Sequence, residues 1–250
     1  MKSNGSWLST LNPSCKLFVH LLVMFALMGI KDPVLTLVLW LLAVVIGVTL
    51  GGWTPSYLLR RLVPYLLFFV MVFWMLAAFG KGEQVLWQWA WFRVSEESLR
   101  NGLLIGLRML GFVTYGLLFT STTDLNRLMM SLVHQCRLSP KWAYGMLAGF
   151  RFIPLFQSEL KQMKAAHRIR GYRQRNSGKA FMRYALPLFT QGVRKSERIA
   201  IAMEARGFTG TRERTYYVQP VMTKRDYAYA LGLLIMAAAL ILLISLSPSL

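Results

Sequence analysis

The sequence predicts an all-α membrane protein in which about five transmembrane helices are combined with a cytoplasmic helical domain. Hydrophobic residues make up 55% of the 250 residues and charged residues only 16%, whereas a soluble domain usually carries about 25% charged residues. One strongly basic stretch lies between the fourth and the fifth apolar run. We therefore expect transmembrane helices 1–4 over residues 1–119, the helical domain over 120–226, and a C-terminal transmembrane helix over 227–250.

Apolar runs mark the candidate crossings, each of which needs about 20 residues. They are Leu17–Ile30, Val34–Leu50, Leu62–Phe79, Leu103–Phe119 and Tyr227–Leu246. The first two are short, so they must recruit flanking residues or tilt little; a single bent re-entrant pair is the alternative. Aromatic residues typical of membrane interfaces flank the third run: Trp53, Tyr57, Trp87, Trp89 and Trp91.

The basic residues predict the orientation of the chain. A cytoplasmic N-terminus places inside Lys2, Lys16, Arg60, Arg61 and the whole segment Thr120–Asp226. The few basic residues left outside are balanced by acidic ones, which agrees with the positive-inside rule. We expect a multi-pass protein of the cell inner (plasma) membrane with its C-terminus outside. The same rule accounts for the net charge of +19 without a nucleic-acid partner.

The predicted crossings contain almost no ionisable residues. None holds Asp or Glu, which argues against a secondary transporter, because ion-coupled carriers usually need carboxylates within the membrane. Arg108 is the exception. It either lines a polar crevice or meets an acidic group of a partner, or it extends toward the outer interface with its charged end in water.

The stretch between the fourth and the fifth crossing predicts amphipathic helices. Thr120–Asp124 is a run of residues that favour helix N-caps. Apolar residues at helical spacing follow it: Leu125, Leu128, Met129, Leu132 and Val133. Ser139-Pro140 then restarts the chain before the apolar segment Trp142–Phe152.

Two further helices are expected toward the end of this stretch. Pro154 is expected to reset the backbone and to open a helix that runs toward Arg170. A polar linker over Tyr172–Lys179 separates it from a helix that runs from about Leu186-Pro187 to Arg206.

Charge in this region is almost entirely positive. From Arg151 to Arg214 there are fifteen basic and four acidic residues. Attraction to anionic lipid headgroups, worth about 1 kcal/mol per basic residue near the membrane, explains many of these charges. It does not explain why both of these helices are expected to end in the same pair of residues.

Both helices are expected to end on Arg-Gly, at Arg170-Gly171 and again 36 residues later at Arg206-Gly207. Glycine is preferred just past a helix end because it adopts the left-handed backbone without strain, and a cation there complements the helix dipole. Each helix is therefore predicted to present an arginine outward. Small residues in the last turns suggest that the two helices cross closely there: Ala165, Ala166, Ala202 and Ala205.

Nothing in the chain resembles a catalytic or metal centre. The cysteines and histidines have no ligand spacing (Cys15, Cys136, His20, His134 and His167), and the four acidic residues of the basic region form no plausible pair. A phosphate-binding Gly-x-x-x-x-Gly-Lys-Ser/Thr loop is also missing, since Ser177–Ala180 lacks the upstream glycine and the hydroxyl. We expect no enzyme activity, no metal site and no cofactor.

At the Arg-Gly ends the chain resembles the transmembrane T component of energy-coupling factor (ECF) transporters, the family of cobalt-, biotin- and thiamine-precursor systems. That family carries two Ala-Arg-Gly signatures at the ends of cytoplasmic coupling helices. Ala205-Arg206-Gly207 is similar to the second in full, and Ile169-Arg170-Gly171 is similar to the first except that Ile169 replaces alanine. Arg151–Leu155 resembles the segment that enters the first coupling helix, and Thr122–Asp124 the turn after the fourth crossing.

The resemblance implies a scaffold of an ABC-type importer that takes up a vitamin or cobalt. Two cytoplasmic ABC-type ATPase subunits, as a homo- or heterodimer, would dock on the coupling helices with Arg170 and Arg206 each seated in a groove of one ATPase. Arg151, Pro154 and Glu204 would support the placement of the helices. A small substrate-binding integral membrane subunit would pack against the crossings in the lipid bilayer.

Two alternatives from other classes stay open at the level of sequence. One is an integral membrane enzyme that acts on a phosphorylated or lipid substrate. The other is a membrane anchor with a basic, lipid-binding cytoplasmic face. Copurification of ATPase subunits distinguishes the scaffold from both.

Overall fold

The computed structural model describes residues 5–80, 85–89, 92–171, 178–211, 215–216 and 219–245, and helices dominate this part of the chain, as predicted. The chain divides into two units, one formed by Met1–Leu128 with Pro220–Leu250 and the other by Met129–Gln219.

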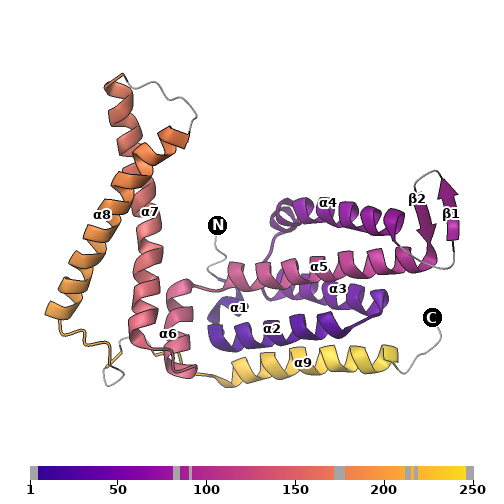
Figure 1. Ribbon diagram of the computed structural model, residues 1–250. Helices are drawn as coiled ribbons and strands as arrows, with labels where there is room; N and C mark the ends of the chain where they lie inside the picture. The colour runs from indigo at the N-terminus through magenta and orange to yellow at the C-terminus, as the bar shows by residue number, and fades with distance from the viewer. Residues whose placement is uncertain are drawn as a thin grey trace. The chain divides into compact units, whose positions relative to one another are not determined.

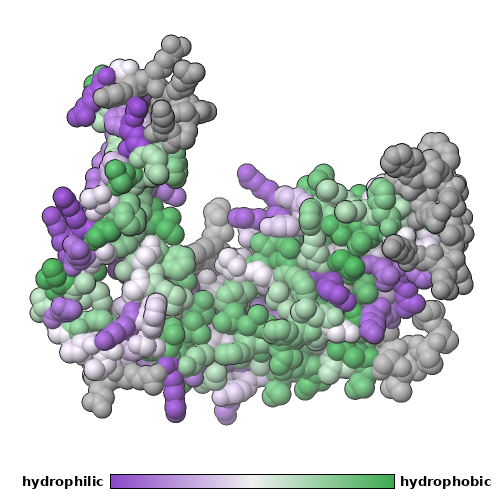
Figure 2. Space-filling view, viewed as in Figure 1, coloured by the Kyte–Doolittle hydropathy of each residue, from purple (hydrophilic) through white to green (hydrophobic). Residues whose placement is uncertain are grey.

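The first unit contains the five predicted apolar helices, which run alongside one another in Figure 1. They are α2 (Pro13–Gly29), α3 (Pro33–Thr49), α4 (Pro55–Phe79), α5 (Glu96–Thr122) and α9 (Lys224–Ser245), and the short α1 (Trp7–Thr10) precedes them. Hydrophobic side chains cover much of the visible face of this unit (Figure 2).

Local sequence sets the starts of α2, α3 and α4, each of which has proline at its first position. Proline fits there because that residue's N–H has no partner within the helix. The preceding residue caps the helix: the side chains of Asn12, Asp32 and Thr54 accept hydrogen bonds from backbone N–H groups of the first turn. For this reason α4 begins seven residues before the predicted Leu62.

Among the described residues, α4, α5 and α9 are long and apolar enough to cross a membrane. The helices α2 and α3 have 17 residues each, which corresponds to about 26 Å and is shorter than the hydrocarbon core of about 30 Å. Large apolar side chains remain exposed on α4, including Leu67 (73%) and Trp74 (63%). Such a surface belongs to an integral membrane protein.

Buried residues of α2, α3, α5 and α9 form the core of this unit, with Val23, Leu39, Tyr115, Leu118 and Leu233 among them. The Tyr115 hydroxyl donates to the Leu39 carbonyl at 3.2 Å, so the phenol is satisfied inside the core. The close approach of α4 to α5 depends on Gly106, because a Cβ there would lie 2.6 Å from the Phe69 ring.

A two-stranded antiparallel hairpin between α4 and α5 is a feature that the sequence analysis missed. It consists of β1 (Val85–Trp89) and β2 (Phe92–Ser95), with Trp89 paired to Phe92. Tryptophan at every second position of 87–91 was the available signal, because side chains alternate along a strand. Trp91 lies outside the described residues, and the interfacial role of Trp87, Trp89 and Trp91 stays a prediction.

The helices α6 (Leu125–Gln135), α7 (Pro140–Ile169) and α8 (Gly178–Ala205) follow α5. The Asp124 side chain accepts from the backbone N–H groups of Asn126 and Arg127, so it caps α6 as predicted. Met129 and Val133 of the predicted apolar stripe are buried. Residues 172–177 of the predicted linker lie outside the described residues.

Two expectations about helix starts are wrong, because both prolines lie inside helices. Pro154 is within α7, which runs unbroken for 30 residues, and Pro187 is within α8, which starts at Gly178. An internal proline loses one backbone hydrogen bond and costs about 3 kcal/mol. Long helical segments on both sides, and the contact between α7 and α8 just beyond the prolines, offset that cost.

Candidate functional site

The C-terminal end of α7 has the geometry that the sequence predicted. Arg170 caps the helix, and its N–H bonds to the Ala166 carbonyl at 3.1 Å. Gly171 follows in the left-handed region at φ 73° and donates to the Arg168 carbonyl at 3.1 Å. An L-residue with a Cβ would be strained there, so glycine ends the helix directly after the arginine.

The end of α8 repeats this arrangement. Gly207 has φ 81° and donates to the Glu204 carbonyl at 2.9 Å, while the Phe208 N–H reaches the Met203 carbonyl at 2.9 Å. These two bonds form a complete Schellman motif, which satisfies carbonyls that the helix itself leaves free. The Phe208 ring lies 5.4 Å from the Tyr144 ring, edge to face, and this contact anchors the chain as it leaves the helix.

The six predicted site residues are all solvent-exposed: Ile169, Arg170, Gly171, Ala205, Arg206 and Gly207. Ile169 is 87% exposed, which is unusual for an apolar side chain without a binding partner. Within the described part of the chain, no side-chain hydrogen bond or ion pair engages Arg170 or Arg206. Both arginines are therefore available to a partner.

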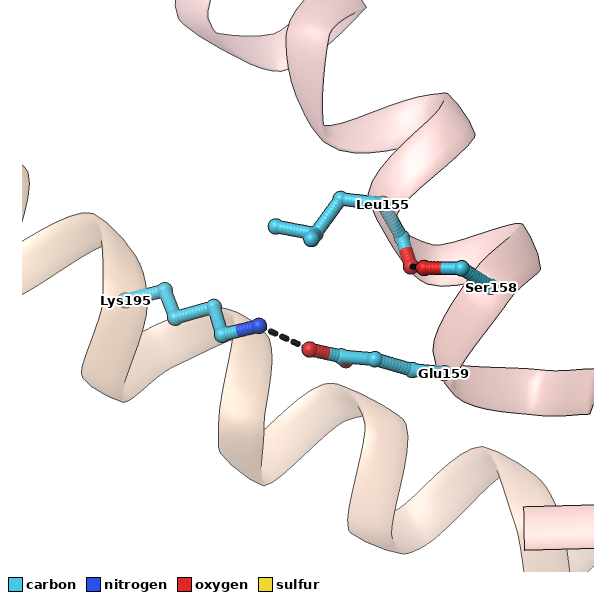
Figure 3. Close-up of polar contacts among 4 residues, drawn as sticks. All are labelled: Leu155, Ser158, Glu159 and Lys195. Carbon is cyan, nitrogen blue, oxygen red and sulfur yellow. Dashed lines mark hydrogen bonds and ion pairs between the residues drawn. The ribbon is translucent and has the colours of Figure 1, made fainter. Parts of the chain in front are cut away.

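The helices α7 and α8 cross in their middles, within the second unit (Figure 1). Phe156 packs against Gly192, where an added Cβ would lie only 2.9 Å from the ring. One turn further along, Lys195 forms an ion pair with Glu159 (Figure 3). Both contacts join residues 36 positions apart in sequence, the same separation as the two arginines.

Because the separation is constant, α7 and α8 are related by an approximate local two-fold axis at the crossing, and a residue of α7 corresponds to the residue 36 positions later in the chain. Arg170 lies 14 residues beyond Phe156, and Arg206 lies 14 residues beyond Gly192. At about 1.5 Å per residue, each arginine is about 21 Å from the crossing. The His167 ring contacts the Tyr184 ring at 5.2 Å, so the helices run in opposite senses and carry the arginines to opposite sides of the crossing.

The prediction that alanines form the crossing is wrong. All four alanines of the last turns are exposed: Ala165, Ala166, Ala202 and Ala205. In an antiparallel pair the two C-terminal ends point apart, so they cannot pack on each other. Gly192 supplies the close approach instead, and the alanines leave the surface next to each arginine uncrowded.

Other exposed charges lie on the same helices. Lys164 and Arg168 precede Arg170 on α7, and on α8 Arg198 and Glu204 precede Arg206, whereas Glu159 is already neutralised by Lys195. A partner that offers carboxylates or backbone carbonyls suits this surface, because the arginine fork donates several hydrogen bonds at once.

The three predicted supporting residues occupy different positions. Arg151 is exposed on α7, three residues before Pro154 inside the same helix. Glu204 is exposed, and its carbonyl accepts the Gly207 N–H. Their support of helix placement stays a prediction.

A buried polar cluster in the first unit was not foreseen from sequence. Lys16, predicted only as a cytoplasmic charge, is 1% exposed, and its Nζ donates to the carbonyls of Leu8 (2.8 Å) and Thr122 (3.1 Å). Asp226 accepts from the backbone N–H of Asn12 at 2.7 Å. The N-terminal segment thus holds both the end of α5 and the start of α9.

Arg108 also has a structural partner. Its Nη2 donates to the Ile30 carbonyl at 2.7 Å, so it caps the C-terminal end of α2. A cation at that position complements the helix dipole. Neither alternative offered from sequence, a polar crevice or an outward-extended side chain, had anticipated this contact.

Across the described residues, no group of three or more His, Cys, Asp or Glu side chains is placed to hold a metal ion.

Comparison with known proteins identifies relatives over most of the chain. A family model described as CbiQ, cobalt transport protein, matches residues 4–217. The energy-coupling factor transporter transmembrane protein EcfT of Lacticaseibacillus paracasei is 28% identical over 258 residues, which cover 95% of this chain and 94% of that relative. The EcfT protein of Brevibacillus brevis is 30% identical over 207 residues, which cover 74% of this chain and 76% of that relative. The EcfT protein of Exiguobacterium sibiricum is 27% identical over 246 residues, which cover 93% of this chain and 84% of that relative.

Proposed function

This chain belongs to the CbiQ cobalt transport protein family, and from that membership we propose that it is the transmembrane T component of an ECF-type ABC importer. In this role it is a scaffold that couples ATP hydrolysis by other subunits to the movement of a substrate-binding membrane subunit. The names of its relatives support the role. Hydrolysis itself would take place in the partner subunits.

One observation carries the proposal: two helices end in the same exposed Arg-Gly motif at equal distances from their crossing. A partner with two equivalent subunits fits two equivalent ends. We propose two ABC-type ATPase subunits, each of which receives one arginine, Arg170 or Arg206, in a groove. When the ATPases close and reopen, the arms of about 21 Å would turn about the Phe156–Gly192 contact.

The substrate would be held by a separate small membrane protein. The apolar surface of the C-terminal part of α4, with Trp74 and Met75 exposed, offers such a protein a place to pack within the membrane. We further propose that the chain lies in the inner membrane with the second unit in the cytoplasm. The distribution of basic residues supports that orientation.

Copurification tests the proposal. The Arg170→Ala/Arg206→Ala variant should insert into the membrane normally and lose most of the ATPase subunits that the wild type retains in detergent. Lys161→Gln/Arg194→Gln is the matched control, because it removes two exposed charges from the same helices, nine and twelve residues before the two arginines. Full retention of both ATPases by the first variant, or equal loss in the control, would refute the role assigned to the arginines.

A further inference from the structure

A pocket in the first unit lies between the start of α4 and the end of α5. Its volume is about 690 Å3, which is within the usual range for small-molecule sites. Hydroxyl or guanidinium groups are contributed by seven of its lining residues: Thr54, Ser56, Tyr57, Arg60, Arg61, Thr120 and Ser121. Its other lining residues carry no charge, so the pocket is strongly positive.

Trp53, one of the lining residues, is buried and hydrogen-bonded. It is 5% exposed and donates from Nε1 to the Ser121 hydroxyl at 3.0 Å. The Arg61 guanidinium lies 5.6 Å from the centre of the Tyr57 ring, in a cation–π contact. Within the described part of the chain, no carboxylate pairs with Arg60 or Arg61. Two exposed cations thus share the pocket with hydroxyl-bearing side chains.

An apolar track continues from the pocket. Along α4, Leu59 (63%), Val63 (47%) and Leu67 (73%) are exposed on successive turns of one face, and Leu117 of α5 lines the pocket itself. Figure 2 shows hydrophilic surface at the N-terminal end of α4 and hydrophobic surface along the rest of the helix. A ligand that combines a phosphate with hydrocarbon chains matches both parts.

We propose that this pocket binds the headgroup of an anionic phospholipid, with Arg60 and Arg61 on the phosphate and the acyl chains along α4. Basic pockets at the cytoplasmic ends of transmembrane helices suit such headgroups. A zwitterionic lipid fits less well, because no carboxylate lines the pocket to receive its cation. The proposal depends on the membrane location of the chain and not on its partners.

The test uses the purified full chain, stripped of lipid in detergent and exposed to phosphatidylglycerol and phosphatidylcholine, with bound lipid counted by native mass spectrometry. We expect one phosphatidylglycerol to be retained in preference to phosphatidylcholine. Each arginine near a lipid surface contributes about fivefold, so Arg60→Gln/Arg61→Gln should weaken binding about 25-fold. The matched control, Lys224→Gln/Arg225→Gln, removes an exposed basic pair from the first turn of α9 and should change binding less than about twofold.

Two further measurements distinguish a lipid site from the alternatives. Ser56→Trp should block the pocket while it retains both arginines, and should lower binding even if the arginine variant misfolds. Free glycerol phosphate should fail to displace the lipid; displacement would assign the site to a soluble phosphate compound and overturn the proposal. Equal binding of the two lipids, or equal losses in the α9 control, would overturn it as well. Because no ATPase is present, this outcome is independent of the docking experiment.

Discussion

The Phe156–Gly192 contact gives the sharpest prediction, because Gly192→Leu should separate the two crossed helices at their pivot. A Cβ at Gly192 would lie 2.9 Å from the Phe156 Cζ atom, whereas carbon atoms in contact are normally about 3.5–4.0 Å apart. The overlap is therefore about 0.6–1.1 Å before the rest of the leucine is added. Overpacking of this kind typically costs about 1–3 kcal/mol, so we expect the free energy of unfolding to fall by about that amount.

The same contact predicts a rescue. Phe156→Ala alone should destabilise by about 2 kcal/mol, roughly half the cost for a fully buried phenylalanine, because this side chain is only half-buried. In the double variant the leucine occupies the space that the ring vacates. The combined loss should then be smaller than the sum of the single losses by about 1–2 kcal/mol, within the range for residues in contact.

Chemical unfolding of the full chain in detergent, followed by circular dichroism, measures all three variants. Gly149→Leu is the control, because it lies on α7 with no atom within 4 Å of an added Cβ. Replacing a helical glycine at an open site should stabilise by up to about 1 kcal/mol. Additive losses at positions 156 and 192, within about 0.5 kcal/mol, would show that these side chains do not meet and that the crossing lies elsewhere.

Three further predictions concern stability and orientation. Lys16→Met should lower the melting temperature in detergent, because each buried carbonyl left without its donor costs about 1–3 kcal/mol; an unchanged melting temperature would contradict the buried position of the ammonium group. Gly171→Ala and Gly207→Ala should each lower the free energy of unfolding by about 1–2 kcal/mol, because alanine is strained in the left-handed backbone of these positions. Gly207→Asn should be less harmful, and equal effects of alanine and asparagine would argue against that conformation. A membrane-impermeant maleimide should label the exposed Cys136 in inside-out vesicles and not in intact cells. The half-buried Cys15 should react slowly from either side. Labelling of Cys136 in intact cells would reverse the proposed orientation.

Much of the fold followed from local signals. The apolar runs located α2, α3, α5 and α9 to within a few residues, except that α5 begins seven residues before Leu103. For α4 the proline and threonine cap were visible in the sequence, and hydrophobicity alone placed the start too late. The hairpin was missed because its alternation of tryptophans was interpreted only as an interfacial belt.

The sequence predicted the two Arg-Gly helix ends of the candidate site, but it did not predict where α7 and α8 cross. Arg170-Gly171 and Arg206-Gly207 end their helices as expected, because a glycine in the left-handed region is a local property of five or six residues. The pivot at Phe156 and Gly192 joins residues 36 positions apart, and no local rule identifies which glycine of a helix meets another chain segment. The continuation of α7 through Pro154 has the same origin, since contacts made elsewhere offset a local penalty.

The sequence by itself determined that this is a helical membrane protein, which segments are apolar enough to form its spans, and that two helices end in an outward arginine. Those features depend on composition and on backbone preferences over a few residues. Only the tertiary structure decided where α7 crosses α8, that Lys16 is buried against the ends of other helices, and that Arg108 caps α2. Each of these depends on contacts between residues far apart in the chain, whose free energies outweigh what their immediate neighbours favour.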